Sequence, residues 1–153
     1  MKLNTFLFLF LSILSFSVIA RNVKKSGDVV VLNVNLVTKG TEMAFDQTAL
    51  EVPFGKKIQL TYSNQSETSS EITHNVAIVK IGFEEKLIES LKKNDYDLEK
   101  IDPNFLVAKT KVLEPGEKDT ITFKPEKAGK YTYICLMPGH GTMLGMKGIL
   151  NVK

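Results

Sequence analysis

The stretch from Tyr131 to Gly148 has the sequence YTYICLMPGHGTMLGMKG. Its first residues combine aromatic and β-branched side chains and predict a strand that ends at Cys135, and the Pro-Gly pair after it predicts a tight turn. A new strand is expected from Gly148 to Val152. A loop between two adjacent strands can therefore place a thiolate, an imidazole and a thioether around one point, because it holds Cys135, His140 and three methionines.

These donor types have the chemistry of a copper site. Soft thiolate and thioether ligands beside imidazole select copper, and two histidines with one cysteine and a weak axial methionine describe an electron-transfer centre. The second imidazole has to come from elsewhere, and the chain has only one other histidine, His74, at the start of a predicted strand. Both histidines and the only cysteine fit one site with no such ligand left over.

Each of these residues also has an ordinary structural interpretation. A histidine such as His74 often serves only as a hydrogen-bonded structural residue, and a buried cysteine is usually a small inert hydrophobe. The methionines at 137, 143 and 146 are able to fill gaps in a core or to lie on the surface. The joint pattern favours a metal site, because Cys-x4-His followed by Gly-Met-Lys-Gly and accompanied by His-Asn on another strand rarely arises by accident.

The first 20 residues predict an export signal. Lys2 is followed by an apolar run that ends at Ala20, with small side chains where a signal peptidase cleaves. An uncleaved membrane anchor is the alternative, because the run is only slightly shorter than a bilayer span. Removing 20 of the 153 residues leaves 133, enough for one domain over residues 21–153 with a substantial core. An unligated thiol would be a liability in an oxidising compartment, which again favours a bound metal at Cys135.

Most of the remaining chain predicts short strands at intervals of about ten residues, which indicates an all-β sandwich or barrel. The expected strands are Val29–Val37, Ala49–Val52, Lys57–Tyr62, Asn75–Lys80, Asp119–Phe123 and Lys130–Cys135, with the last at Gly148–Val152. Gly82–Lys93 has apolar residues at helical spacing and predicts one short amphipathic helix. The polar stretch Asn94–Lys111 is expected to be an irregular surface connection between strands.

The composition excludes several classes of function. The chain has 20 Lys and Arg and 17 Asp and Glu, a formal net charge of +3, and these charges are scattered rather than gathered with aromatic residues. A nucleic-acid surface is therefore unsupported. Two histidines are too few for the further coppers of a copper oxidase or nitrite reductase, and one cysteine is too few for a binuclear copper site. No phosphate-binding loop or hydrolase motif is present, so an enzyme with a small-molecule substrate is not expected.

The pattern resembles the cupredoxin family of blue copper proteins, and within it azurin and auracyanin. The resemblance rests on the His-Asn at His74, on Cys-x4-His with Gly-Met-Lys-Gly, and on the segments around Glu42–Asp46 and Leu50–Val52. It implies an eight-stranded Greek-key β-sandwich with one inserted helix and one mononuclear type 1 copper ion. It also implies that His74, Cys135 and His140 match the equatorial copper ligands.

The axial ligand is where this sequence departs from the family pattern. Azurins have three residues between the second histidine and the methionine, and auracyanins have four, whereas here Met143 follows His140 after two residues and Met146 after five. Met146 lies just before the last strand, as the axial methionine does in the family, and an extra loop residue is easily accommodated. We therefore predict Met146, with Met143 as the alternative. Thr73 and Leu136 also replace a glycine and a threonine of azurins, and Leu136 removes a hydroxyl partner of Asn75.

The resemblance implies an electron carrier that passes single electrons between larger redox proteins, such as cytochromes or a membrane oxidase or reductase. Export to the periplasm is expected from the signal segment. His140 is expected to show one ring edge at the surface among Leu136, Met137, Pro138 and Leu144, as an apolar docking site. A copper carrier or scavenger in copper homeostasis is the alternative function, because loop methionines are suited to capture copper(I).

Overall fold

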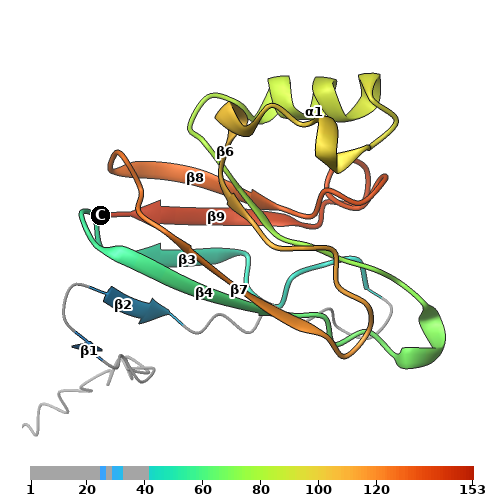
Figure 1. Ribbon diagram of the computed structural model, residues 1–153, viewed down its shortest axis with the longest axis horizontal. Helices are drawn as coiled ribbons and strands as arrows, with labels where there is room; N and C mark the ends of the chain where they lie inside the picture. Colours follow the sequence, from blue (N-terminus) through green and yellow to red (C-terminus); the bar gives the residue numbers. More distant parts are fainter. Residues whose placement is uncertain (1–24, 27–28, 33–41) are drawn as a thin grey trace, which may run out of the picture.

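Two β-sheets packed face to face, with one helix over the outside of one sheet, make up the fold (Figure 1). The computed structural model describes residues 25–26, 29–32 and 42–153. Its strands are β1 (Lys25–Ser26), β2 (Val29–Leu32), β3 (Ala49–Val52), β4 (Lys57–Ser63), β5 (Ala77–Val79), β6 (Leu106–Lys109), β7 (Lys118–Phe123), β8 (Gly129–Ile134) and β9 (Lys147–Val152). The helix α1 spans Glu84–Lys93, and single 3-10 turns lie at Thr68–Ser70, Leu98–Lys100 and Pro103–Phe105. The expected all-β sandwich with one short helix is confirmed.

The chain passes repeatedly from one sheet to the other. The four-stranded sheet has the order β1-β2-β4-β7, and the five-stranded sheet has the order β3-β9-β8-β5-β6. Strand β9 lies between β3 and β8. It is parallel to β3 and antiparallel to β8. Strand β8 pairs antiparallel with β5 as well. The end of β8 and the start of β5 therefore meet at one end of the sandwich, where the ligand candidates lie.

The main core fills the space between the sheets because the strands alternate. In β4, Ile58, Leu60 and Tyr62 are buried while the residues between them are more exposed. In β8, Tyr131 and Tyr133 join this core, whereas Ile134 faces the helix on the other side of the sheet. Successive side chains of a strand point to opposite faces, so Cys135 continues the inward-facing series.

A second core lies between α1 and the five-stranded sheet. Leu87 and Leu91 of α1 are fully buried against it. Glu84 also ties the helix to the sheet, because its carboxylate accepts hydrogen bonds from Thr132 Oγ1 at 2.7 Å and Lys147 Nζ at 2.8 Å. Burial alone would raise the pKa of Glu84, but these bonds and the Lys147 charge outweigh it and lower that pKa. The helix is thereby fixed beside the start of β9.

The boundaries of the predicted elements need small corrections. The helix begins at Glu84 rather than Gly82, and β5 is shorter than the predicted Asn75–Lys80. The second half of the predicted strand Val29–Val37 lies outside the described residues, as does the predicted signal segment. None of the helices in the described part of the chain is long and apolar enough to span a bilayer.

One prediction about the connections is wrong. The segment Asn94–Lys111 is not wholly irregular, because it contains the edge strand β6, which pairs with β5. Only Leu106 of the four residues in β6 is buried, so this strand lacks the apolar alternation that reveals a strand in a sequence. Its pairing partner, rather than its own composition, makes it a strand.

Candidate metal centre

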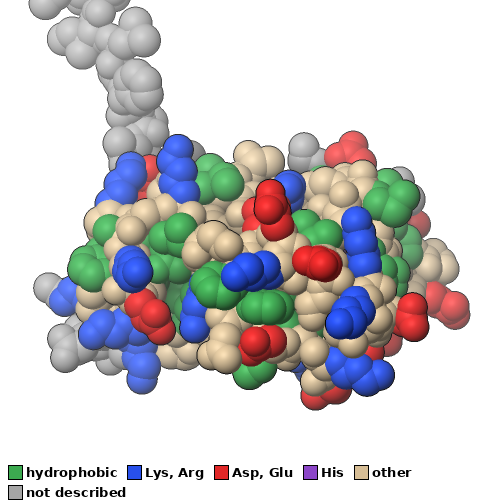
Figure 2. All heavy atoms as spheres, turned by 90° about the horizontal axis from the view of Figure 1, so that it is seen from above, with side chains coloured by type: hydrophobic (Ala, Val, Ile, Leu, Met, Phe, Trp, Pro, Cys, Tyr) green, Lys and Arg blue, Asp and Glu red, His purple; other side chains and the backbone are tan. Residues whose placement is uncertain are grey.

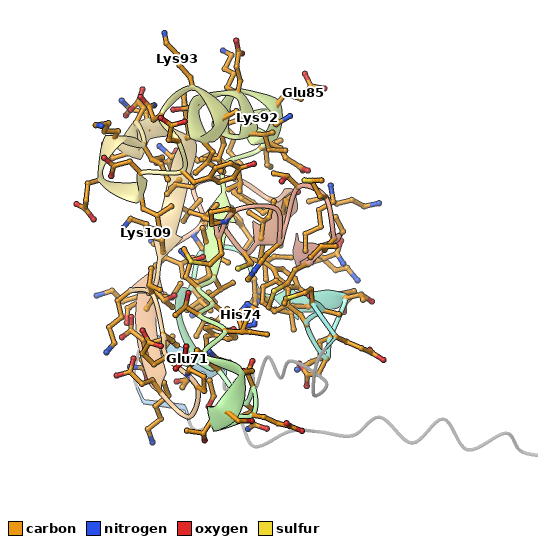
Figure 3. All side chains as sticks on the ribbon, turned by 90° about the vertical axis from the view of Figure 1, so that its right-hand side faces the viewer. Glu71, His74, Glu85, Lys92, Lys93 and Lys109 are labelled. Atoms are coloured by element: carbon orange, nitrogen blue, oxygen red, sulfur yellow. The ribbon has the colours of Figure 1, made fainter. Side chains whose placement is uncertain are left out.

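His74 is held in place by a short bridge to a neighbouring segment. Its backbone N–H donates to the Leu113 carbonyl at 3.1 Å, and its carbonyl accepts from the Leu113 N–H at 2.7 Å. The Asn64 side-chain amide in turn donates to the carbonyls of Leu113 and Ile72, both at 3.0 Å. His74 and Asn64 are both buried. Figure 3, which looks at the end of the sandwich, shows His74 centrally in the molecule and well below α1.

The loop from Cys135 to Met146 is closed by its own backbone. The Cys135 N–H donates to the Met146 carbonyl at 3.0 Å and extends the pairing of β8 with β9. The Met146 N–H donates to the His140 carbonyl at 2.9 Å, and the His140 N–H donates to the Met137 carbonyl at 3.1 Å. These bonds satisfy the backbone of the turn and hold Cys135, His140 and Met146 within one compact loop.

Three predicted ligands converge at this end of the sandwich. Cys135 Sγ lies 3.7 Å from His74 Nδ1 and 3.6 Å from His140 Nδ1, and the two Nδ1 atoms are 3.1 Å apart. Among the described residues, this is the group of His, Cys, Asp or Glu side chains that is close enough to share one metal ion. Metal–nitrogen and metal–sulfur bonds of about 2.0 and 2.3 Å place donors at about these separations. The donor set therefore fits a single soft-ligand ion such as copper.

The electrostatics of the three donors also fit a metal. Burial lowers the pKa of His74 to about 4, with a smaller contribution from His140, and burial lowers the pKa of His140 too. Both imidazoles are therefore neutral at neutral pH, which is the form that binds a metal. Burial raises the pKa of the Cys135 thiol, although backbone hydrogen bonds from Asn75 and Met137 act in the opposite direction. A thiolate at this depth requires a cation beside it.

The two candidate axial methionines differ in their exposure to solvent. Met146 is fully buried in the same core cluster as Cys135, whereas the side chain of Met143 is 83% exposed. Met143 folds over the outside of the turn, with its sulfur near the α-carbon of Gly139. Met137 is half-buried, and its sulfur accepts a hydrogen bond of 3.5 Å from Thr73 Oγ1. This arrangement supports Met146 as the axial ligand, which stays a prediction.

Leu136 lies elsewhere than expected. It was predicted beside His140 at the surface, but it is buried in the cluster beneath α1, because it alternates with the inward-facing Cys135. Its backbone N–H donates to Asn75 Oδ1 at 2.8 Å, which links the Cys135 loop to the segment that leads from His74 into β5. The Asn75 Nδ2 group has no hydrogen-bond partner among the described residues. The expected consequence of a leucine at position 136, a missing partner for Asn75, is therefore seen.

Gly141 is a site residue that the sequence did not single out. A methyl group on its α-carbon would overlap the Ile134 side chain and the Cys135 carbonyl oxygen. Only glycine therefore lets the turn after His140 pack directly on the strand that ends at Cys135. The only signal in the sequence was its place next to a predicted ligand, and Gly139 and Gly145 also adjoin predicted ligands.

Substitution of Gly141 by alanine is expected to change both the stability and the copper spectrum. Overpacking of this kind costs about 1–3 kcal/mol of unfolding free energy, and the displaced Cys135 backbone should shift the thiolate absorption band. Urea denaturation and an absorption spectrum of the copper-loaded variant measure the two effects. Gly116→Ala is the control, because that glycine has a φ of +86° but open space around its α-carbon. The control should lose stability with an unchanged spectrum; an unchanged spectrum in Gly141→Ala would contradict the packing argument.

A β-sandwich that brings two histidines and one cysteine together at one end defines the class of cupredoxin-like copper proteins. The copper-binding proteins of the plastocyanin/azurin family match residues 32–153, and the chain belongs to this family. Its cofactor is accordingly one mononuclear copper ion.

Individual relatives agree with this assignment. The chain is 34% identical over 115 residues to auracyanin-B of Chloroflexus aurantiacus, covering 72% of this chain but 47% of that protein. It is 28% identical over 127 residues to auracyanin-A of the same organism, covering 78% of this chain and 75% of the relative. The chain thus spans about half the length of auracyanin-B. A crystal structure of reduced auracyanin from Roseiflexus castenholzii superposes with a TM-score of 0.69 at 32% identity, covering 79% of this chain and 96% of the other.

Proposed function

We propose that this protein is an exported type 1 copper protein that carries single electrons between redox partners. The observation that carries the proposal is the convergence of Cys135 Sγ, His74 Nδ1 and His140 Nδ1 within 3.7 Å of one another. These three residues would hold the copper together with Met146, whose thioether would be the weakest donor. Copper supplies a one-electron couple between its two oxidation states. A C. aurantiacus relative of known structure, auracyanin A, is described as a "blue" copper protein.

The protein around the three donor atoms suits a copper site whose charge changes while the geometry of its ligands stays the same. His74 is fixed by its bridge to Leu113, and the Cys135 loop is fixed by its bonds to Met146 and Asn75. Ligands locked by packing and outer hydrogen bonds keep one geometry in both oxidation states, which keeps the reorganisation energy small. Both His74 and Cys135 are buried, so water is excluded from most of the site.

His140 gives the site its route to the surface. Its ring is only half-buried, and the exposed side chains of Pro138, Met143 and Leu144 lie in the same loop. An apolar patch of this kind is suited to a small, transient interface with a redox partner. The face covered by α1 differs, because basic and acidic side chains are interspersed there (Figure 2). We infer that partners dock at the His140 end.

The test of the proposed function is reversible colour. The oxidised, copper-loaded protein should absorb intensely in the red, lose the colour on reduction and regain it on oxidation with one copper bound throughout. The alternative, a copper carrier or scavenger, requires release of copper, so metal content after dialysis of the reduced protein separates the two functions. Loss of copper in each cycle, or no coloured complex at all, would refute the electron-carrier proposal.

If partners dock at His140, Leu144→Glu should slow electron exchange without changing the absorption spectrum. Leu144 is 59% exposed, so a charge there should leave the absorption band unchanged while an apolar partner surface is repelled. We expect electron exchange with a redox partner to slow about tenfold, equivalent to about 1.4 kcal/mol. Stopped-flow kinetics measure this rate. Met137 is less suitable for the same test, because it packs against the core and accepts a hydrogen bond from Thr73.

Ile81→Glu is the matched control for this prediction. Ile81 is also an exposed apolar residue, at 45% exposure, but it lies beside Gly129 at the start of β8, the end of the strand opposite Cys135. Its substitution should leave the exchange rate unchanged. Equal slowing by both variants would mean that partners do not dock specifically at the His140 end.

Export and domain organisation complete the proposal. Residues 1–20 are proposed to be a cleaved signal peptide, and residues 21–153 a single cupredoxin domain in the periplasm. The composition of the first 20 residues supports export. Mass spectrometry of the mature protein tests it: an N-terminus at Arg21 is expected, and a retained Met1 would indicate an anchor instead.

A further inference from the structure

The carboxylate of Glu84 bridges the two strands on either side of the loop that carries the predicted ligands. Its Oε2 accepts a hydrogen bond from Thr132 Oγ1 of β8 at 2.7 Å, and its Oε1 accepts one from Lys147 Nζ of β9 at 2.8 Å. Thr132 lies three residues before Cys135, and Lys147 directly follows Met146. One side chain of α1 therefore holds the loop at both of its ends.

The ion pair between Glu84 and Lys147 differs from the other ion pairs of the described residues. Its side chains are 33% and 47% exposed, whereas each of the other pairs has a member that is more than half exposed. It is also the one pair among them with a member next to a predicted ligand. Partly buried charges are screened less by salt than exposed ones, so this pair is suited to act on the neighbouring ligand.

The helix α1 can serve as an anchor because apolar packing fixes it on the sheet. Leu87 and Leu91 are fully buried in the cluster that contains the two neighbours of Cys135, which are Ile134 and Leu136. In Figure 1, α1 lies over the ends of β8 and β9 that the loop connects. Removing one charge from the first turn of α1 should therefore leave the helix in place and release only the start of β9.

The direction of the Met146 side chain depends on the start of β9. Met146 belongs to the main core, while the side chain of the next residue, Lys147, reaches Glu84 on the outer face of the sheet. Met146 is also the central residue of a three-residue turn, because the Lys147 N–H donates to the Gly145 carbonyl at 2.7 Å. Backbone hydrogen bonds limit this turn from the loop side, and the Lys147 side chain limits it from the strand side.

We propose that Glu84 is a positioning residue of the copper centre, which fixes the direction of the Met146 thioether through its ion pair with Lys147. This inference rests on the proposed function, with Met146 as the weakest donor. An axial thioether bond is weak and long, so a small displacement of its backbone changes its donation while the three other ligands stay in place. Weaker donation disfavours copper(II) and raises the reduction potential.

Glu84→Gln should therefore raise the reduction potential of the copper-loaded protein. The glutamine amide keeps the volume and an acceptor for Thr132, but it removes the charge that holds Lys147. A partly exposed ion pair changes an equilibrium by up to about fivefold. We expect a change of about threefold in electron exchange with a reference couple, which corresponds to about 28 mV. Redox titration at one pH measures this shift.

The metal-free protein gives a second measurement. The Met146 N–H donates to the His140 carbonyl, and the exchange of this amide hydrogen with solvent reports local opening of the turn. In metal-free Glu84→Gln, this amide should exchange about threefold faster than in the parent, because the same ion pair is lost.

Lys147→Leu separates positioning from a direct effect of charge. A positive charge favours the reduced state, so through space the loss of Glu84 raises the potential, whereas the loss of Lys147 lowers it. The loss of a shared anchor instead raises the potential in both variants. Leucine keeps the apolar part of the side chain and offers no donor to Glu84. The double variant should shift the potential no further than either single variant.

Glu51→Gln is the matched control. Glu51 of β3 forms an ion pair with Lys153, which directly follows the other end of β9. The same charge is removed from an ion pair of the same strand, but away from the predicted ligands. The potential and the exchange rate of the Met146 amide should both be unchanged.

The outcomes separate this inference from the proposed function. A raised potential in both Glu84→Gln and Lys147→Leu, with the parent value in Glu51→Gln, supports the positioning role. A lowered potential in Lys147→Leu, an unaltered one in Glu84→Gln, or an equal shift in Glu51→Gln overturns that role and leaves the electron-carrier proposal standing. A parent protein without a red band overturns both.

Discussion

Replacing Cys135 with serine is expected to abolish the intense red absorption of the copper-loaded protein. A serine hydroxyl does not ionise at neutral pH and gives no thiolate-to-copper transition, although it fills nearly the same space. Copper affinity should fall by more than about a hundredfold, since loss of an outer-sphere partner alone costs about 10–100-fold. Absorption spectroscopy and a competitive copper titration measure the two effects.

The fold of the Cys135→Ser variant must be checked separately. Cys135 is buried in the main core, so a metal-free urea denaturation curve close to that of the parent shows that the loss of colour reflects the ligand. An unaltered red band in this variant would show that Cys135 does not bind the copper, and the proposed centre would have to be abandoned.

Met146→Leu is expected to leave a blue protein with a higher reduction potential. Loss of a weak thioether donor destabilises copper(II) more than copper(I), and the shift should be of the order of a tenfold change in equilibrium, about 59 mV or about 1.4 kcal/mol. Leucine and methionine have similar volumes, so the buried position should tolerate the change. Redox titration of variant and parent at one pH measures the shift.

Met143→Leu is the control for the axial ligand. Its side chain is 83% exposed on the outside of the turn, whereas Met146 is fully buried with Cys135. The potential of Met143→Leu should therefore equal that of the parent within error. If Met143→Leu moves the potential and Met146→Leu does not, the ligand assignment is reversed.

The sequence predicted the parts of the site that depend on residue type and local spacing. Cys135 and His140 lie five positions apart in one loop, and His74 is the only other histidine. Because the chain has so few possible ligands of these types, the sequence was enough to predict that these three side chains lie together. Most strands were also predictable, because residues such as Ile58 and Leu60 alternate with polar neighbours.

What the sequence did not predict depends on contacts between distant segments. Strand β6 exists because β5 supplies its partner, and Leu136 is buried because α1 covers the outer face of β8. The need for glycine at position 141 follows from the close approach of the turn to the Cys135 carbonyl.

The position of β9 between β3 and β8 has a consequence for how the protein folds. Ala49 in β3 pairs with Ile149 in β9, so the five-stranded sheet closes only after segments far apart in the chain have met. Such long closures slow folding, and all-β domains typically need milliseconds to seconds. Until β9 docks, the Cys135 N–H lacks its Met146 carbonyl partner. A newly made chain would therefore pass through a period in which its single thiol is open to oxidants, and a metal ion would meet the full donor set only at the end.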